Sequence, residues 1–257
     1  NAMTTAVFAA LSATQIQALT TSQVSNLTTA TVGALTSGQL NSLKSTQIKA
    51  MTTSQVNAIS TSTLSNLRGS QLALLSTSQV AAITTSNVAS LTSTQVASLT
   101  TDQIGQLGAT QVCALTATQI TSLKRDVLAT MGAEQIQSIK PTVLGAMSTA
   151  QIGGLTSAQV AELTVAQAKS LTNGQMAAFT SSQISQLGAD QIATLTASQM
   201  ANINVNVVSK LTPDQVSSIS LSAVSGLTVG QLAKFTTDQV TALTKEQVGK
   251  LTPTQIA

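Results

Sequence analysis

The side chains that do most enzyme chemistry are nearly absent from this chain of 257 residues. It contains no His, Trp or Tyr, and its single Cys is Cys113. His- and Cys-based metal clusters, disulfide frameworks and catalytic triads are therefore excluded. Eight Asp and Glu residues remain for paired-carboxylate chemistry of the kind that glycosidases use. Seven of the eight occupy a single position of a repeat, so the sequence predicts no catalytic, cofactor-binding or metal-binding residue and no cofactor.

That repeat is eight residues long and runs through the chain. Every eighth residue from Leu11 to Leu251 is a large apolar residue, which gives 31 consecutive anchors without an insertion or a deletion. With the anchor as position 1, the consensus octad is Leu-Thr-x-x-Gln-Val-x-x, and position 5 is Gln in 24 of the 31 octads. A fixed period of this kind indicates a repeat architecture in which each unit packs against its neighbours.

Positions 2 and 5 of the octad match a helix-capping motif. In the octad that begins at Leu19, the hydroxyl of Thr20 can accept from the N–H of Gln23, and the Gln23 side chain can accept in return from the N–H of Thr20. Leu19 and Val24 then stand where a hydrophobic staple places its two apolar residues. Each octad is therefore predicted to form one short capped helix.

The prolines and the acidic residues independently support this frame. Pro141, Pro213 and Pro253 all follow the cap directly, at the first helical position, where a missing N–H costs nothing. The next position favours negative charge because it lies at the positive end of the helix dipole. It holds every acidic residue except Glu162, namely Asp102, Asp126, Glu134, Asp190, Asp214, Asp238 and Glu246.

The predicted fold is an all-α solenoid, a superhelical rod of about 31 two-turn helices, each roughly 9 Å long. Residues 3–257 are predicted to form one continuous array, an excerpt of a longer one, and residues 1–2 are interpreted as a vector remnant. A β-solenoid is the alternative, because the abundant Thr, Ser, Val and Ile suit strands. Positions 1 and 6 have opposite parity, however, and a strand would send them to opposite faces.

Neither the charge nor the hydropathy of the chain indicates a binding partner. Charged residues make up 7% of the chain and the formal net charge is +3, which gives no support to a nucleic-acid or acidic-membrane partner. Four basic residues replace the cap Thr and are expected to be isolated on solvated faces: Lys44, Arg68, Lys124 and Lys140. Cys113 stands at position 7, where it is expected to act as a larger Ala. No apolar run is long enough to span a membrane.

The octad run resembles the Ser/Thr-rich repeat regions of very large bacterial exported proteins, which are often labelled adhesin, haemolysin-like or haem-utilisation proteins. The resemblance implies a stalk or spacer, extracellular or at the cell surface, whose partners are other domains of the same protein or further copies joined end to end. A second, local similarity covers Leu211 to Ser220, LTPDQVSSIS, and links it to the start of a TAL-effector repeat. Those repeats carry a second helix and a base-reading loop that an octad cannot house, so DNA binding does not transfer.

Three hypotheses about function follow from the sequence. The leading one is a non-catalytic structural repeat module that acts as a surface stalk. The alternative is a ligand-binding array, in which regularly spaced Ser and Thr meet a periodic partner such as a glycan, ice or another copy of the chain. The third is a TAL-like nucleic-acid binder, whose affinity would fall steeply with added salt.

Overall fold

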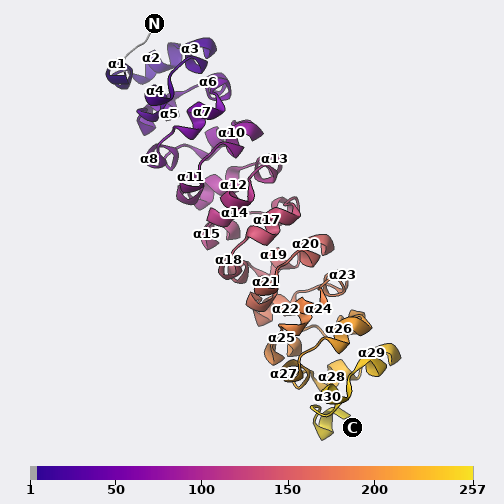
Figure 1. The fold of residues 1–257 in the computed structure, drawn as a ribbon. Coiled ribbons are helices and arrows are strands. Elements are labelled where there is room, and N and C mark those ends of the chain that lie inside the picture. Colours follow the sequence, from indigo (N-terminus) through magenta and orange to yellow (C-terminus); the bar gives the residue numbers. More distant parts are fainter. Residues whose placement is uncertain (1–4, 257) are drawn as a thin grey trace. The chain divides into compact units, whose positions relative to one another are not determined.

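The computed structural model describes residues 5–256, and the regular elements in this range are all helices (Figure 1). They form 31 short α-helices, α1 to α31, and one 3₁₀ helix, η1. No β-strand occurs within this described range, so the all-α solenoid prediction is confirmed and the β-solenoid alternative is wrong. The chain comprises two compact units, of which the first ends at Thr130 and the second begins at Met131.

The helices of the first unit are α1 (Thr5–Ala9), α2 (Ala13–Ala18), α3 (Thr21–Ser25), α4 (Thr29–Gly33), α5 (Ser37–Ser42), α6 (Ser45–Ala50), α7 (Thr53–Asn57), α8 (Thr61–Leu64), α9 (Gly69–Leu72), α10 (Thr77–Ala81), α11 (Thr85–Ser90), α12 (Ser93–Ser98), α13 (Thr101–Gly105), α14 (Ala109–Ala114), α15 (Ala117–Thr121) and α16 (Arg125–Leu128). Those of the second unit are α17 (Ala133–Ser138), α18 (Pro141–Ala146), α19 (Thr149–Ile152), α20 (Ser157–Ala161), α21 (Val165–Ser170), α22 (Asn173–Ala177), α23 (Ser181–Ile184), α24 (Ala189–Ala193), α25 (Ala197–Ala201), η1 (Val208–Lys210), α26 (Pro213–Ser217), α27 (Leu221–Val224), α28 (Val229–Leu232), α29 (Thr237–Ala242), α30 (Lys245–Val248) and α31 (Pro253–Ile256).

The helix starts follow the predicted capping frame. Before α7, Thr52 is extended (φ −76°, ψ 160°), its hydroxyl accepts from the N–H of Gln55, and the Gln55 side chain accepts from the N–H of Thr52. The same reciprocal pair recurs in most octads of both units. Where the cap is a glycine, as at Gly108, the hydroxyl bond is lost and the bond from the cap N–H to Gln111 remains, at 2.8 Å. Pro213 begins α26 at the position that the sequence predicted.

The helices are shorter than the two turns predicted, because both the anchor and the cap are extended. The anchor Leu99 lies at φ −65°, ψ 140° and the cap Thr100 at φ −75°, ψ 164°, so at most six residues of each octad remain helical. The α-helices accordingly contain four to six residues, a little over one turn each. Two extended residues in succession turn the chain, and within the described residues no positive φ angle is used to do so.

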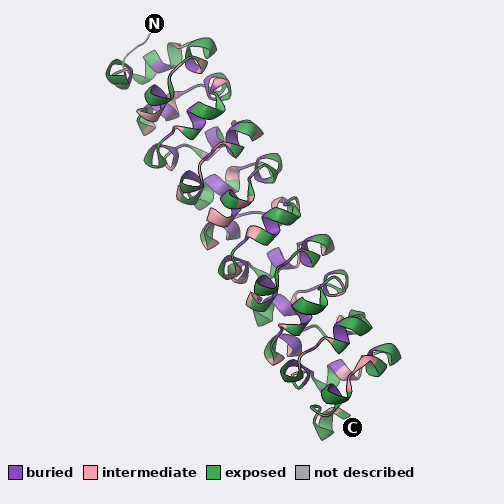
Figure 2. Cartoon of the chain, viewed as in Figure 1, coloured by how far each residue is buried: buried purple, intermediate pink, exposed green. Residues whose placement is uncertain are grey.

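Helices three octads apart pack against each other within each unit. In the first unit α2 contacts α5 and α11 contacts α14, and in the second α18 contacts α21 and α26 contacts α29. Positions 1 and 6 fill the core between them: Val96 and Ile104 are fully buried, while Leu99 is 6% exposed. Apart from α31, which has no buried residue, the α-helices each have a buried and an exposed side (Figure 2). Burial of this apolar stripe stabilises helices that are too short to persist alone.

Burial at the ends shows which neighbour covers each position. Position 6 is exposed in the last helices, where Val240 is 54% and Val248 43% exposed, although Val24 near the other end is 1% exposed. Gln15 and Gln23, at position 5, are exposed near the N-terminal end. The following turn therefore covers position 6, and the preceding turn covers position 5.

The octad that begins at Ile203 departs from the rule. Its cap is Asn204, whose side chain accepts from the N–H of Asn206 two residues on, at 2.9 Å, so the N–H of Val207 bonds to the backbone carbonyl of Asn204 instead. A turn and the 3₁₀ helix η1 replace the predicted α-helix. A missing Gln alone does not cause this, since α16 and α18 form without one and without a side-chain cap bond. The bond from the N–H of Asn206 to the Asn204 side chain, together with the weak helix formers Val205, Val207 and Val208, distinguishes this octad.

Candidate functional site

The most regular polar feature of the molecule is a set of buried glutamines at position 5, which we call the glutamine ladder. Gln103, which is 2% exposed, represents it. Its Oε1 accepts from the N–H of Thr100 at 2.9 Å, and its Nε2 donates to the backbone carbonyls of Leu72 at 3.2 Å and Leu75 at 2.7 Å. One amide thus caps its own helix and bonds to the preceding turn, 28 and 31 residues earlier.

Ladder bonds of this kind recur along both units. They are made by Gln39, Gln47, Gln55, Gln71, Gln79, Gln95, Gln103, Gln111, Gln119, Gln159, Gln167, Gln175, Gln183, Gln191, Gln199, Gln215, Gln231, Gln239, Gln247 and Gln255. Since 28 residues are three and a half octads, one turn of the solenoid takes between three and four octads. The ladder therefore determines, within each unit, which residues of one turn lie against which residues of the next.

The sequence prediction found only the capping half of this interaction. A capping box accepts Glu as readily as Gln, yet position 5 is never Glu in the 31 octads. This preference for Gln over Glu could have indicated the second interaction, because a side-chain amide offers a donor and an acceptor together whereas a carboxylate only accepts. A carboxylate in the same place would face backbone carbonyls with no hydrogen to share.

The seven octads without Gln at position 5 keep the ladder in part. Asn87 donates to the carbonyl of Ile59 at 2.8 Å, and the hydroxyl of Thr63 donates to that of Leu35 at 3.1 Å. Val143 and Ala223 bury an apolar side chain at the same position. The ladder thus tolerates interruptions, and the seven positions are Thr31, Thr63, Asn87, Val127, Val143, Val207 and Ala223.

An irregular rung occurs at Gln71 in α9. Its Nε2 donates to the carbonyls of Asn41 at 3.0 Å and Leu43 at 3.3 Å. The N–H of the cap residue, Arg68, bonds instead to the side-chain oxygen of Asn41 at 3.1 Å, and Asn41 also donates to the carbonyl of Asn66 at 2.8 Å. Asn41 has thereby taken the donor that the Gln71 oxygen would otherwise receive.

The Gln71 side-chain oxygen is consequently a buried acceptor without a hydrogen-bond partner. Among the residues that the structure describes, no other buried side-chain nitrogen or oxygen is in this state. The residue is 8% exposed, and an unsatisfied buried polar group costs about 1–3 kcal/mol. We therefore expect this octad to be less stable than its sequence pattern predicts.

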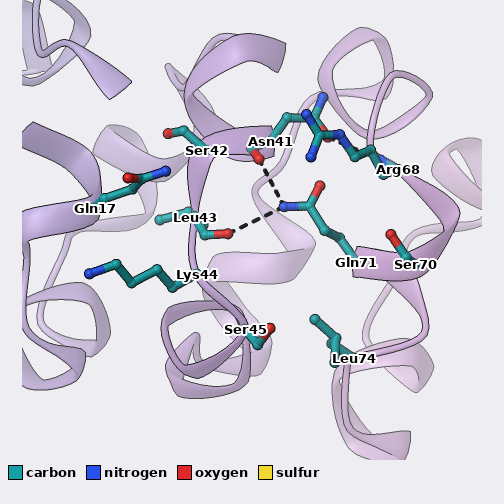
Figure 3. A pocket seen from close by; sticks show the side chains of 10 residues that line it. All are labelled: Gln17, Asn41, Ser42, Leu43, Lys44, Ser45, Arg68, Ser70, Gln71 and Leu74. Atoms are coloured by element: carbon teal, nitrogen blue, oxygen red, sulfur yellow. Dashed lines mark hydrogen bonds between the residues drawn. The ribbon is translucent and has the colours of Figure 1, made fainter. Parts of the chain in front are cut away.

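An open pocket of about 440 Å³ lies against Gln71 (Figure 3). It spans three successive levels of the first unit: α2, the junction of α5 with α6, and α9. Its two cationic side chains, Lys44 and Arg68, occupy cap positions three octads apart. The lining consists of Gln17, Asn41, Ser42, Leu43, Lys44, Ser45, Arg68, Ser70, Gln71 and Leu74.

This pocket corrects the expectation that the four basic caps are isolated. Lys44 and Arg68 line one hollow, because the solenoid brings octads three apart close together. Lys124 and Lys140 are absent from its lining. No Asp or Glu precedes Asp102 in the chain, so the sequence around the pocket carries positive charge alone.

The remaining reactive side chains have ordinary surroundings. Cys113 lies half-buried in α14 as a free thiol. Glu162, the acid outside the dipole position, ends α20 and accepts a hydrogen bond from Gln137 at 2.8 Å. Within residues 5–256 no group of three or more metal-ligating side chains converges, and no helix there has the length and hydropathy to cross a bilayer.

Fold and polar architecture together define a helical tandem-repeat module. Comparison with known families agrees: the model of the ALTTAQ repeat matches residues 1–29, 32–69, 128–165 and 142–173. The matched ranges lie in both units, and they support the assignment of a tandem-repeat region. No curated protein matches the chain.

Proposed function

We propose that this chain is a non-catalytic structural repeat module that acts as a stalk or spacer in a large bacterial surface or secreted protein. The glutamine ladder is the observation that carries the proposal. Most octads bond one side-chain amide to the backbone of the preceding turn, so the most regular polar interaction of the chain joins each turn of the solenoid to the one before it. Such a design suits a protein whose task is to hold its ends apart.

The exported setting rests on the resemblance to Ser/Thr-rich repeat regions of bacterial surface proteins. The ALTTAQ match supports the repeat module itself. In this setting the partners are neighbouring domains of the same protein, or further copies that continue the solenoid end to end. Low charge density fits a surface that is exposed to solvent and makes few specific contacts.

Small-angle X-ray scattering on length variants tests the spacer. Deletion of residues 75–106 removes four octads and keeps the register. Because packed helices lie 8–10 Å apart, the loss of about one turn should shorten the longest dimension by roughly 10 Å. A second in-frame deletion, of residues 159–190, should shorten it by a similar amount. Unchanged dimensions in folded variants would contradict the spacer.

A ligand-binding array is the second candidate, favoured by the regular exposure of positions 3 and 4. Thr53 and Ser54 in α7 are exposed, as are Thr101 and Asp102 in α13. An array presents one equivalent site per octad or per turn. Its binding stoichiometry for a glycan or for ice should fall in the two deletion variants in proportion to length, whereas a spacer shows no binding that scales with length.

A further inference from the structure

We infer that this chain associates end to end with a second copy of itself, through the same contacts that join its own successive turns. The first turn of one copy lies on the last turn of the other, and Gln15 and Gln23 donate to backbone carbonyls across the junction. The inference deepens the spacer proposal and rests on it, because it assigns the residues through which a further copy continues the solenoid.

The first turn presents two amide donors that lack acceptors. The Oε1 atoms of Gln15 and Gln23 cap their own helices, accepting from the N–H of Ser12 and of Thr20 at 2.8 Å each. Both glutamine side chains are exposed, and neither Nε2 donates to a carbonyl among the described residues. Elsewhere in the ladder this Nε2 donates to a carbonyl 28 residues earlier. The first turn therefore carries ladder donors whose acceptors must come from another turn.

The last turn presents the matching acceptors. In the interior, anchor carbonyls accept the ladder bonds of the following turn. The carbonyls of Leu243 and Leu251 are anchors of the same kind, and no donor within residues 5–256 reaches them. The two donors, Gln15 and Gln23, are one octad apart, and so are the two acceptors. Both bonds can therefore form in a single register.

The last turn also exposes the apolar side chains that a following turn would cover. Position 6 is 54% exposed at Val240, 43% at Val248 and 61% at Ile256. At Val216, which lies one turn earlier, it is 0% exposed. On the first turn, Val7 at position 5 is also 54% exposed. Burial of these side chains drives association, and the ladder bonds determine its register.

The contact is heterologous, because the two faces differ. Two first turns placed together would set amide donors against amide donors, and two last turns would set carbonyls against carbonyls. No charged residue precedes Lys44, so the first turn brings no like charge toward the last one. Each bound copy leaves one face of either kind free, and a heterologous contact that does not close on itself produces an open filament.

Analytical ultracentrifugation of the full chain over a concentration series is the measurement. Between about 5 and about 500 µM, the weight-average mass should rise at least twofold and pass that of a dimer. Gln15→Glu combined with Gln23→Glu keeps each cap acceptor but sets carboxylates against carbonyls, so this double variant should stay monomeric. Gln106→Glu makes the same change at an exposed glutamine outside both faces and should associate as the unchanged chain does.

A second pair of variants tests the last turn. Val248→Lys places a charge where a following turn must pack, so the variant should stay monomeric. Val165→Lys is its matched control, because Val165 in α21 is exposed to a similar extent, 46%, and lies outside the last turn. All the substituted side chains are exposed in the single chain, so each variant should keep its helical circular dichroism.

A mixture of the two blocked proteins distinguishes this contact from any other association. The double Gln variant retains a usable last turn and Val248→Lys retains a usable first turn, so together they should form a dimer and stop there. A chain that stays monomeric, a mixture without dimer, or an equal loss in the two controls would overturn the inference. The scattering test of the spacer uses dilute monomers, so failure here leaves its outcome unaffected.

Discussion

The glutamine ladder makes a prediction about Gln103 that a capping box alone would not make. In Gln103→Ala the N–H of Thr100 loses its acceptor, and the buried carbonyl of Leu75 loses the ladder bond. The carbonyl of Leu72 keeps a bond from the N–H of Leu75 at 3.2 Å. A buried acceptor left unsatisfied costs about 1–3 kcal/mol, and the cap bond adds roughly 0.5–1.5 kcal/mol. The expected loss is therefore about 2–4 kcal/mol.

Two variants in the same octad isolate the cross-turn contribution. Thr100→Ala removes only the cap hydroxyl bond to the N–H of Gln103, at 3.2 Å, and should cost about 1 kcal/mol. Gln103→Glu keeps an acceptor for the cap N–H but removes the amide donor, and it places a carboxylate against two carbonyls. A capping box would tolerate that change, whereas the ladder predicts a loss at least as large as that of Gln103→Ala.

Hydrogen exchange read by mass spectrometry suits this comparison, because repeat arrays open locally. A loss of 2–4 kcal/mol corresponds to a rise of roughly 30- to 1000-fold in the opening equilibrium around α13. Peptides several turns away should exchange as in the unchanged protein. If Gln103→Ala opened the octad no more than Thr100→Ala, or if Gln103→Glu were neutral, the ladder would not stabilise the fold and the reasoning would be refuted.

Five further substitutions test the packing and the irregular rung. Asn41→Ala frees the N–H of Arg68 to donate to the Gln71 oxygen, so the free energy of unfolding measured in urea should fall by no more than about 0.5 kcal/mol. A loss above about 2 kcal/mol would show that Gln71 does not accept this bond. Gly226→Ala would place a Cβ 2.6 Å from Cα of Ala197 and should lower the free energy of unfolding by about 1–3 kcal/mol. Gly105→Ala meets nothing within 4 Å and should raise the free energy of unfolding by about 0.5–1 kcal/mol. Equal effects of the two substitutions in thermal melts would contradict the packing. Val216 is 0% exposed, so Val216→Ala should lower the free energy of unfolding by about 2 kcal/mol. Val240 is 54% exposed, so Val240→Ala should lower it by under about 0.5 kcal/mol. A similar loss from both would show that position 6 is not buried by the following turn.

Several features of this protein could be predicted from its sequence because they depend on neighbours three or four residues apart. The hydroxyl of Thr52 and the amide of Gln55 meet within one helical turn whatever the tertiary structure does, and position 3 suits Pro213 for the same local reason. The helix length was overestimated, because the pattern does not show that the anchor and the cap are both extended. The sequence did not predict the failure of the helix after Asn204, because an absent Gln, as at Val207, does not prevent an α-helix in the other octads that lack it.

The candidate pocket could not be predicted from the sequence. Its members come from octads that begin at Leu11, Leu35, Leu43 and Leu67, and nothing in the octad pattern gives the number of octads per turn. The four basic caps were therefore expected to be isolated. The shared pocket lining of Lys44 and Arg68 and the missing acceptor bond of Gln71 both depend on which octads lie one above the other.

The sequence by itself determined the repeat, the capped helix in each octad and the burial of positions 1 and 6, since local bonding and apolar periodicity set all three. Only the tertiary structure decided how many octads complete a turn, which carbonyls the glutamines reach and which cap residues meet in a pocket. Those contacts join residues 24 to 31 apart, through Nε2 of Gln103 to the carbonyl of Leu72 for example. Side-chain packing between turns determines that spacing, and the sequence of a single octad contains no information about it.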